Sequence, residues 1–92
     1  MEREDSVPYV NQESRNKYNN ITDKIANITI ETKGDLEYLI FILMQQYMST
    51  REKRYTTLHD CVYAAIHAGE EYKRRYLDKR EDEAREINGD VI

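Results

Sequence analysis

The chain has 92 residues, and its 18 acidic and 14 basic side chains give a formal net charge of −4. The acidic pI of about 5.2 argues against a protein that coats duplex DNA or an anionic membrane. A single cysteine excludes an internal disulfide, and no export signal is recognisable, so we expect a cytoplasmic protein. A chain of this length forms one domain, residues 1–92, whose own core is small, and oligomerisation is a common remedy.

The N-terminal third is expected to form an arm followed by a helix. Residues 1–10 are predicted to be the arm, because Pro8 favours an extended conformation in the residue before it. A helix is predicted over residues 11–30, since its apolar side chains recur three and four residues apart. These side chains are Tyr18, Ile21, Ile25 and Ile28.

The central helix is predicted over residues 35–49, with Gly34 ending the preceding segment and Asp35 as the N-cap. Its apolar run would be about 20 Å long, which is short of the ~30 Å of a bilayer core. The run is apolar on nearly every face. Such a helix must be packed on several sides, so we expect one side to face its own chain and another to face a partner chain.

A long third helix is predicted over residues 57–86, capped by Thr56 or Thr57, and residues 87–92 form a tail. Small residues along this helix allow another helix to approach closely. The basic segment before it is either a solvated loop or a ligand-binding loop. The fold class is therefore all-α: a small three-helix domain with an apolar central helix, assembling as a helical homo-oligomer.

The residues usual in catalytic and metal sites do not form a recognisable pattern. The run His-Asp-Cys at residues 59–61 cannot act as a relay, because adjacent helical side chains diverge by about 100°. His59 and His67 are eight residues apart, which does not suit a zinc site. Glu83 and Glu86 have the spacing of one carboxylate pair. Helical nucleotide hydrolases hold magnesium with two such pairs, and the sequence does not contain the second one. We therefore expect no catalytic residues, no metal and no cofactor.

The most informative stretch is a block of opposed charge. Residues 71–80 carry five positive and two negative side chains, whereas residues 81–90 carry five negative and one positive. The two blocks can pair with each other, within the helix or between chains. Alternatively, Arg74 and Arg75 grip a phosphate while Tyr72 stacks on a base. Tyr72 and Tyr76 are one helical turn apart, and tyrosines at this spacing are also typical of a core.

The C-terminal tail offers a further pair of polar groups. Asn88 and Asp90 carry donors and acceptors that match the edges of nucleobases. The alternative is a frayed tail, in which Gly89 ends the last helix with a left-handed backbone.

Several short motifs, taken in order, resemble a widespread family of small phage-encoded helical proteins. They are Val-Pro-Tyr-Val at 7–10, Gly-Asp-Leu-Glu-Tyr at 34–38, Tyr-Thr-Thr-Leu at 55–58, the basic run at 71–75, Glu-Asp at 81–82 and Asn-Gly-Asp-Val at 88–91. The chain departs from the family pattern at Lys79 and Arg80, where a Pro-Tyr pair is usual. The family is similar to the phage anti-CBASS sponge proteins, which form tetramers and sequester cyclic dinucleotides such as 3′,3′-cyclic GMP-AMP.

The resemblance implies an immune-evasion protein that binds a cyclic dinucleotide in the cytoplasm of an infected bacterium and does not cleave it. It implies a homo-oligomer of two or four chains, without duplex nucleic acid or membrane as partners. The residues expected to contact the ligand are Arg74 and Arg75 for phosphate, Tyr9 and Tyr72 for stacking, and Asn88 and Asp90 for base edges. The alternative is a small structural or regulatory phage protein that binds another protein through its helical surface.

Overall fold

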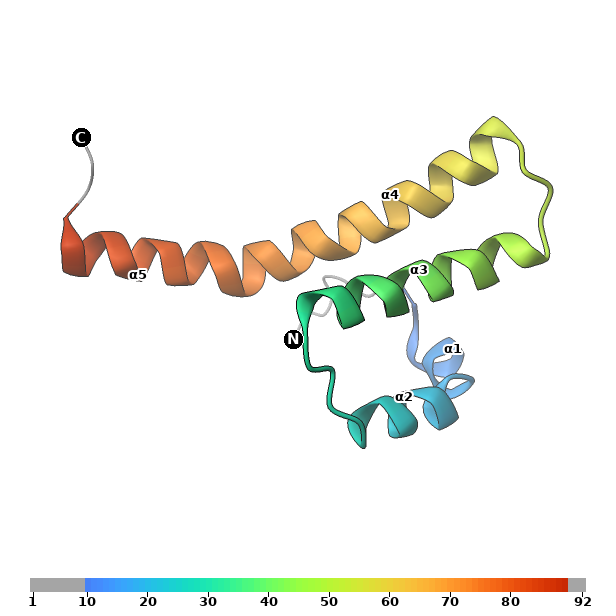
Figure 1. The fold of residues 1–92 in the computed structure, drawn as a ribbon, viewed down its shortest axis with the longest axis horizontal. Helices are drawn as coiled ribbons and strands as arrows, with labels where there is room; N and C mark the ends of the chain where they lie inside the picture. Colours follow the sequence, from blue (N-terminus) through green and yellow to red (C-terminus); the bar gives the residue numbers. More distant parts are fainter. Residues whose placement is uncertain (1–9, 90–92) are drawn as a thin grey trace. The chain divides into compact units, whose positions relative to one another are not determined.

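The computed structural model describes residues 10–89, and within this range every element of secondary structure is a helix (Figure 1). The all-α class predicted from the sequence is confirmed. The chain divides into two compact units, Met1–Glu31 and Thr32–Ile92, which are described separately. The predicted contact residues Tyr9 and Asp90 lie outside the described residues.

The first unit contains two short helices, α1 (Gln12–Asn16) and α2 (Asn19–Ala26), where the sequence predicts one helix over residues 11–30. Asn11 caps α1, because its side chain accepts a hydrogen bond from the Ser14 N–H at 2.8 Å. The break at residues 17–18 falls in an asparagine-rich run whose side chains compete for backbone hydrogen bonds. The predicted apolar stripe of this unit is exposed at Tyr18 and at each of its isoleucines.

The second unit begins with α3 (Lys33–Ser49). Its N-cap is Thr32 and not Asp35, because the Thr32 hydroxyl accepts a hydrogen bond from the Asp35 N–H at 3.0 Å. Asp35 instead lies in the first turn, where a carboxylate interacts favourably with the helix dipole. Gly34 is also part of this turn, so the helix begins two residues before the sequence predicts.

A loop at residues 50–54 leads into α4 (Tyr55–Tyr72), which lies beside α3 as the second arm of a helical hairpin (Figure 1). The N-cap of α4 is Arg54 and not Thr56 or Thr57, because the helix begins two residues before the sequence predicts. The Thr57 hydroxyl, in the first turn, accepts a hydrogen bond from the Arg54 N–H at 3.1 Å. One π-helical turn, η1 (Lys73–Leu77), follows directly, and α5 (Asp78–Asn88) continues from it. Gly89 ends α5 with a φ of 87°, the positive value that glycine adopts at little cost.

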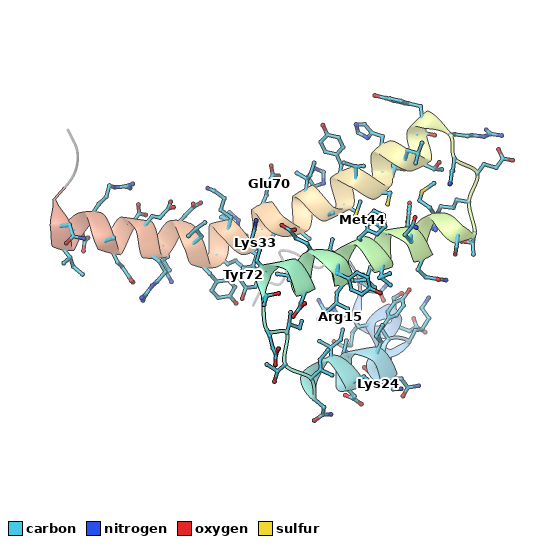
Figure 2. All side chains as sticks on the ribbon, viewed as in Figure 1. Arg15, Lys24, Lys33, Met44, Glu70 and Tyr72 are labelled. Atoms are coloured by element: carbon cyan, nitrogen blue, oxygen red, sulfur yellow. The ribbon has the colours of Figure 1, made fainter. Side chains whose placement is uncertain are left out.

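Very little of the described chain is buried. Met48 of α3 and Cys61 of α4 are the only buried residues among residues 10–89. The Cys61 thiol lies 3.6 Å from the Met44 carbonyl oxygen, and Figure 2 shows Met44 on the side of α3 that faces α4. Large apolar side chains elsewhere on α3 are exposed, Tyr38 by 64% and Phe41 by 58%. Within the second unit, α4 therefore covers only one side of the apolar central helix.

No helix between residues 10 and 89 is both long enough and apolar enough to span a membrane.

Candidate functional site

The candidate site is built on the π-helical turn η1 between α4 and α5. A π-helical turn inserts one extra residue per turn, so the side chains after it point in a different direction from the one the α-helical period gives; such turns are frequent at functional sites. The turn holds Arg74, Arg75 and Tyr76, and Tyr72 directly precedes it. Two of the predicted phosphate ligands and one predicted stacking residue are thus within one short stretch.

Glu71 joins the two arginines. One of its carboxylate oxygens, Oε2, accepts a hydrogen bond from Arg74 Nη2 at 2.6 Å and another from Arg75 Nε at 2.5 Å. Each guanidinium has five N–H donors, so donors of both arginines remain for a further anion. The cluster of one carboxylate and two guanidiniums keeps a formal charge of +1.

The two halves of this cluster differ in exposure. The Glu71 side chain is half-buried, with 22% of its surface accessible, whereas Arg74 and Arg75 are accessible by 63% and 45%. The hydrogen bond from Arg75 lowers the pKa of Glu71, with Arg74 contributing in the same direction. The carboxylate therefore stays ionised and fixes both guanidiniums on the solvent side of the helix.

An aromatic pair lies next to the arginines. The ring centroids of Tyr72 and Tyr76 are 4.6 Å apart and their planes are tilted by 45°. Both side chains are exposed, so neither is the core residue that the helical spacing allowed as an alternative. Their ring faces are available for stacking on a planar ligand.

The remaining basic residues of this block mostly pair within the helix. Lys73 Nζ contacts Asp78 at 2.7 Å, and this hydrogen bond raises the pKa of Lys73. Arg80 lies 3.4 Å from Glu83 one turn later. The Arg80–Glu83 pair joins the two blocks of opposed charge, whereas the Lys73–Asp78 pair lies within the first block. The guanidiniums in the cluster of Glu71, Arg74 and Arg75 remain exposed to solvent.

The predicted ligand residues are not all brought together. Tyr72, Arg74 and Arg75 share one turn of helix, whereas Asn88 is the last residue of α5. Sixteen residues of helix separate Tyr72 from Asn88, which is roughly 24 Å at 1.5 Å per residue. Because no side chain spans that distance, one chain cannot offer both residues to one small ligand.

Three features were missed by the sequence reasoning. Glu71 had no role, although its spacing of three and four residues from the arginines marks it as their partner. Tyr76 was not among the predicted ligand residues, although Tyr72 was. The third feature is a ladder of exposed rings along α4, in which His59 stacks on Tyr63 at 4.3 Å. The ladder consists of Tyr55, His59, Tyr63 and His67.

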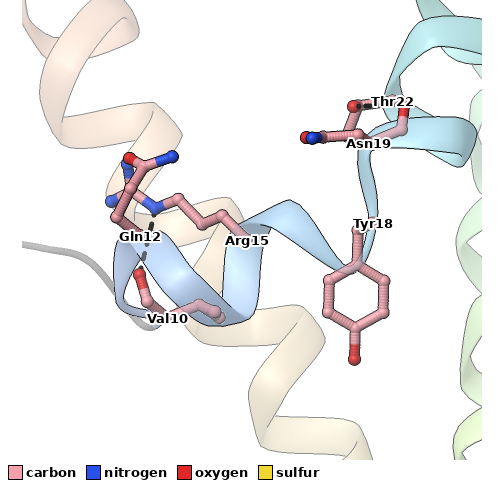
Figure 3. A pocket seen from close by; sticks show the side chains of 6 residues that line it. All are labelled: Val10, Gln12, Arg15, Tyr18, Asn19 and Thr22. Atoms are coloured by element: carbon pink, nitrogen blue, oxygen red, sulfur yellow. Dashed lines mark hydrogen bonds between the residues drawn. The ribbon is translucent and has the colours of Figure 1, made fainter.

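Each of the two units contains a hollow. Within the second unit, an apolar groove of about 740 Å³ runs between α3 and α4 and reaches Tyr72. Within the first unit, a smaller pocket has Gln12 and Arg15 on one side and Tyr18 and Asn19 on the other (Figure 3). Arg15 Nε donates a hydrogen bond to the Val10 carbonyl at 3.0 Å there. Of the predicted ligand residues, those between residues 10 and 89 do not line this smaller pocket.

The described part of the chain holds no group of three or more histidine, cysteine, aspartate or glutamate side chains placed to bind a metal ion. His59 and Cys61 also belong to different surroundings, since His59 stacks on Tyr63 whereas Cys61 is buried between α3 and α4.

The fold and the site define an all-α protein with a helical hairpin and a basic, aromatic π-helical turn. The chain belongs to the family described as Domain of unknown function (DUF6899), whose model matches residues 7–91. No curated protein and no solved structure matches the chain.

Proposed function

We propose that this protein binds a cyclic dinucleotide, of the class that includes 3′,3′-cyclic GMP-AMP, and releases it unchanged. In this proposal it is a phage-encoded sponge that removes the signal of CBASS defence in the cytoplasm of an infected bacterium. The ordered motifs that resemble small phage proteins similar to the anti-CBASS sponges suggest the biological setting. The chemistry of the π-helical turn suggests the kind of ligand.

The proposal rests mainly on the pair of guanidiniums that Glu71 holds in place beside two exposed tyrosine rings. A guanidinium matches the geometry of a phosphate, and a phenol ring stacks on any nucleobase. Because Glu71 holds Arg74 and Arg75 before a ligand arrives, less side-chain entropy is lost on binding. The turn and the residue before it therefore supply a phosphate ligand and a base platform within five consecutive residues, Tyr72 to Tyr76.

A cyclic dinucleotide has two phosphates and two bases in a nearly two-fold arrangement. One chain offers one such turn, so two chains related by a two-fold axis match both halves of the ligand. This arrangement needs no deep pocket in a small chain. It also explains how Asn88, far from Tyr72 in its own chain, can take part, because it would be contributed by a second copy.

A different class of function is favoured by a different observation. The apolar groove between α3 and α4 suits a helix from another protein, as in a structural or regulatory phage protein. The two functions differ in what they predict for small ligands, since protein binding alone requires no nucleotide.

The test is the thermal stability of the purified protein against cyclic dinucleotides, cyclic trinucleotides, cyclic ADP-ribose isomers and linear nucleotides. A ligand at 100 times its dissociation constant stabilises the folded state by about 2.7 kcal/mol, so one class is expected to raise the midpoint clearly. The ligand is then recovered by denaturing the protein and is expected intact. Shortened or opened product would indicate a hydrolase, and no shift across the panel would favour the protein-binding function.

The roles of the arginines are tested by a matched pair of variants. Arg75→Ala removes a charged donor from the proposed phosphate contact, so we expect at least a tenfold loss of affinity, about 1.4 kcal/mol or more. Arg80→Ala removes an equal charge on α5, where Arg80 pairs with Glu83, and is expected to leave affinity nearly unchanged. Equal affinity losses in both variants, measured by titration calorimetry, would reduce the contact to general electrostatics. An Arg75→Ala protein that binds normally but no longer assembles would disprove the phosphate role.

A further inference from the structure

The apolar groove of the second unit carries an inference about what fills it. The groove is lined only by uncharged side chains, contributed by both arms of the helical hairpin. From α3 they are Leu36, Ile40, Leu43, Met44 and Tyr47, and from α4 they are Cys61, Ala64, Ala65, Ala68, Gly69 and Tyr72. Leu43 is 56% exposed and Leu36 is 47% exposed, so the apolar side of the hairpin is open to water.

Exposed apolar side chains continue along α3 inside the groove. Ile40 lies four residues after Leu36 and three before Leu43, and it is 39% exposed. This spacing places the three side chains on one face of the helix. A continuous apolar strip that is open to water is typical of an interaction surface.

The two walls of the groove differ in size in a way that suits a copy of the same surface. The α3 wall carries bulky side chains such as Leu36 and Leu43, whereas the α4 wall carries alanines and Gly69. An added Cβ on Gly69 would meet no atom within 4 Å, so this wall is open to an approaching helix. Under a two-fold axis, the bulky wall of each copy lies against the small wall of the other.

We propose that the groove between α3 and α4 is the isologous interface of a homodimer, in which two hairpins form a four-helix bundle. The interface buries the groove from Cys61 to Gly69 and packs both of its sides on the partner copy, whereas Tyr72, the last α4 residue along the groove, stays exposed for the nucleotide site. The inference makes specific the oligomer that the proposed function requires, but it concerns the ligand-free protein. A dimer that binds no nucleotide would uphold it and overturn the proposed function.

The test compares two lysine substitutions one residue apart on α4. Ala68 is exposed in the groove, so Ala68→Lys places a charge in the interface without filling any space inside one chain. His67 is part of the ladder of exposed rings, with its ring centroid 5.8 Å from that of Tyr63. His67→Lys is therefore the matched control. Sedimentation equilibrium without nucleotide is expected to give at least twice the 11.0 kDa chain mass for the wild type and for His67→Lys. For Ala68→Lys we expect the dimer dissociation constant to rise at least tenfold.

A second measurement covers the case in which Ala68→Lys does not fold. If the groove closes only in the dimer, the thermal midpoint and helical circular dichroism of the wild type must fall on dilution. A wild-type chain that is monomeric at every concentration, with a constant midpoint, would overturn the inference and leave the groove to a different partner. An assembly disrupted by His67→Lys but not by Ala68→Lys would overturn the inference and assign the interface to the face of α4 that carries the ladder of rings.

Discussion

At the scale of single residues, Glu71 organises the candidate site. Its carboxylate holds Arg74 and Arg75 on one oxygen, and without it the two like charges on neighbouring residues would repel each other. The sequence does contain this information, because a glutamate three and four residues before two arginines is a standard helical ion pair. The sequence does not reveal the π-helical turn, since nothing in the residues 73–77 marks a change of helical period.

Glu71→Gln tests this role through the pH dependence of stability. The pKa of Glu71 is lowered in the folded protein, so its ionisation contributes stability above its ordinary value of 4.5. That contribution is lost as the pH falls through the lowered folded pKa. We expect the wild type to lose more stability than Glu71→Gln between about pH 6 and about pH 3, measured as the urea midpoint. Glu86→Gln is the control, because no ion pair joins Glu86 to any residue in the described range, and it is expected to follow the wild type.

The same substitution separates a positioning role from a structural one. In Glu71→Gln both guanidiniums remain but are no longer fixed by a charge, so the proposed nucleotide site loses preorganisation. We expect weaker nucleotide binding near neutral pH, where the folded fraction is unchanged. Glu71→Asp shortens the side chain and keeps the charge, and partial recovery of affinity in that variant would support positioning. Unchanged affinity in Glu71→Gln would mean that the arginines reach a ligand without Glu71.

At the scale of the elements, the sequence predicted which segments are helical better than where they begin and end. The apolar run and the small-residue face gave α3 and the long α4–α5 stretch, because those patterns persist over many residues. The first helix was predicted too long, since its weak helix formers at residues 16–20 allow the chain to break. The start of α3 was placed at Asp35, since Thr32 and Asp35 are both good N-caps and only geometry distinguishes them.

A pair of substitutions distinguishes the two caps. Thr32→Ala removes the acceptor of the Asp35 N–H and is expected to cost about 1 kcal/mol of unfolding free energy. Asp35→Asn removes only a charge from the first turn and is expected to cost about 0.3–1 kcal/mol, less at high salt. Urea unfolding with Thr32→Ser as the control, which keeps the hydroxyl, provides the comparison. A larger loss in Asp35→Asn than in Thr32→Ala would restore Asp35 as the cap.

At the scale of the whole molecule, the sequence predicted that the central helix must be packed on several sides, and within the second unit α4 covers one of those sides. The composition of the candidate site was predictable only in part. Tyr72, Arg74 and Arg75 are neighbours in sequence and therefore in space, whereas Asn88 is separated from them by the length of α5. Sequence order alone cannot reveal which residues of different chains meet, so a site shared between copies is beyond single-chain reasoning.

The ligand stoichiometry follows from this separation. If each chain offers one π-helical turn to one half of a cyclic dinucleotide, titration calorimetry is expected to give one ligand per two chains. Ala68→Lys weakens the proposed groove interface. It is then expected to lower nucleotide affinity, because ligand binding is thermodynamically linked to dimer formation. His67→Lys is expected to bind as the wild type does. One ligand per chain, with equal affinity in Ala68→Lys, would mean that a single turn forms a complete site and that Asn88 has no part in it.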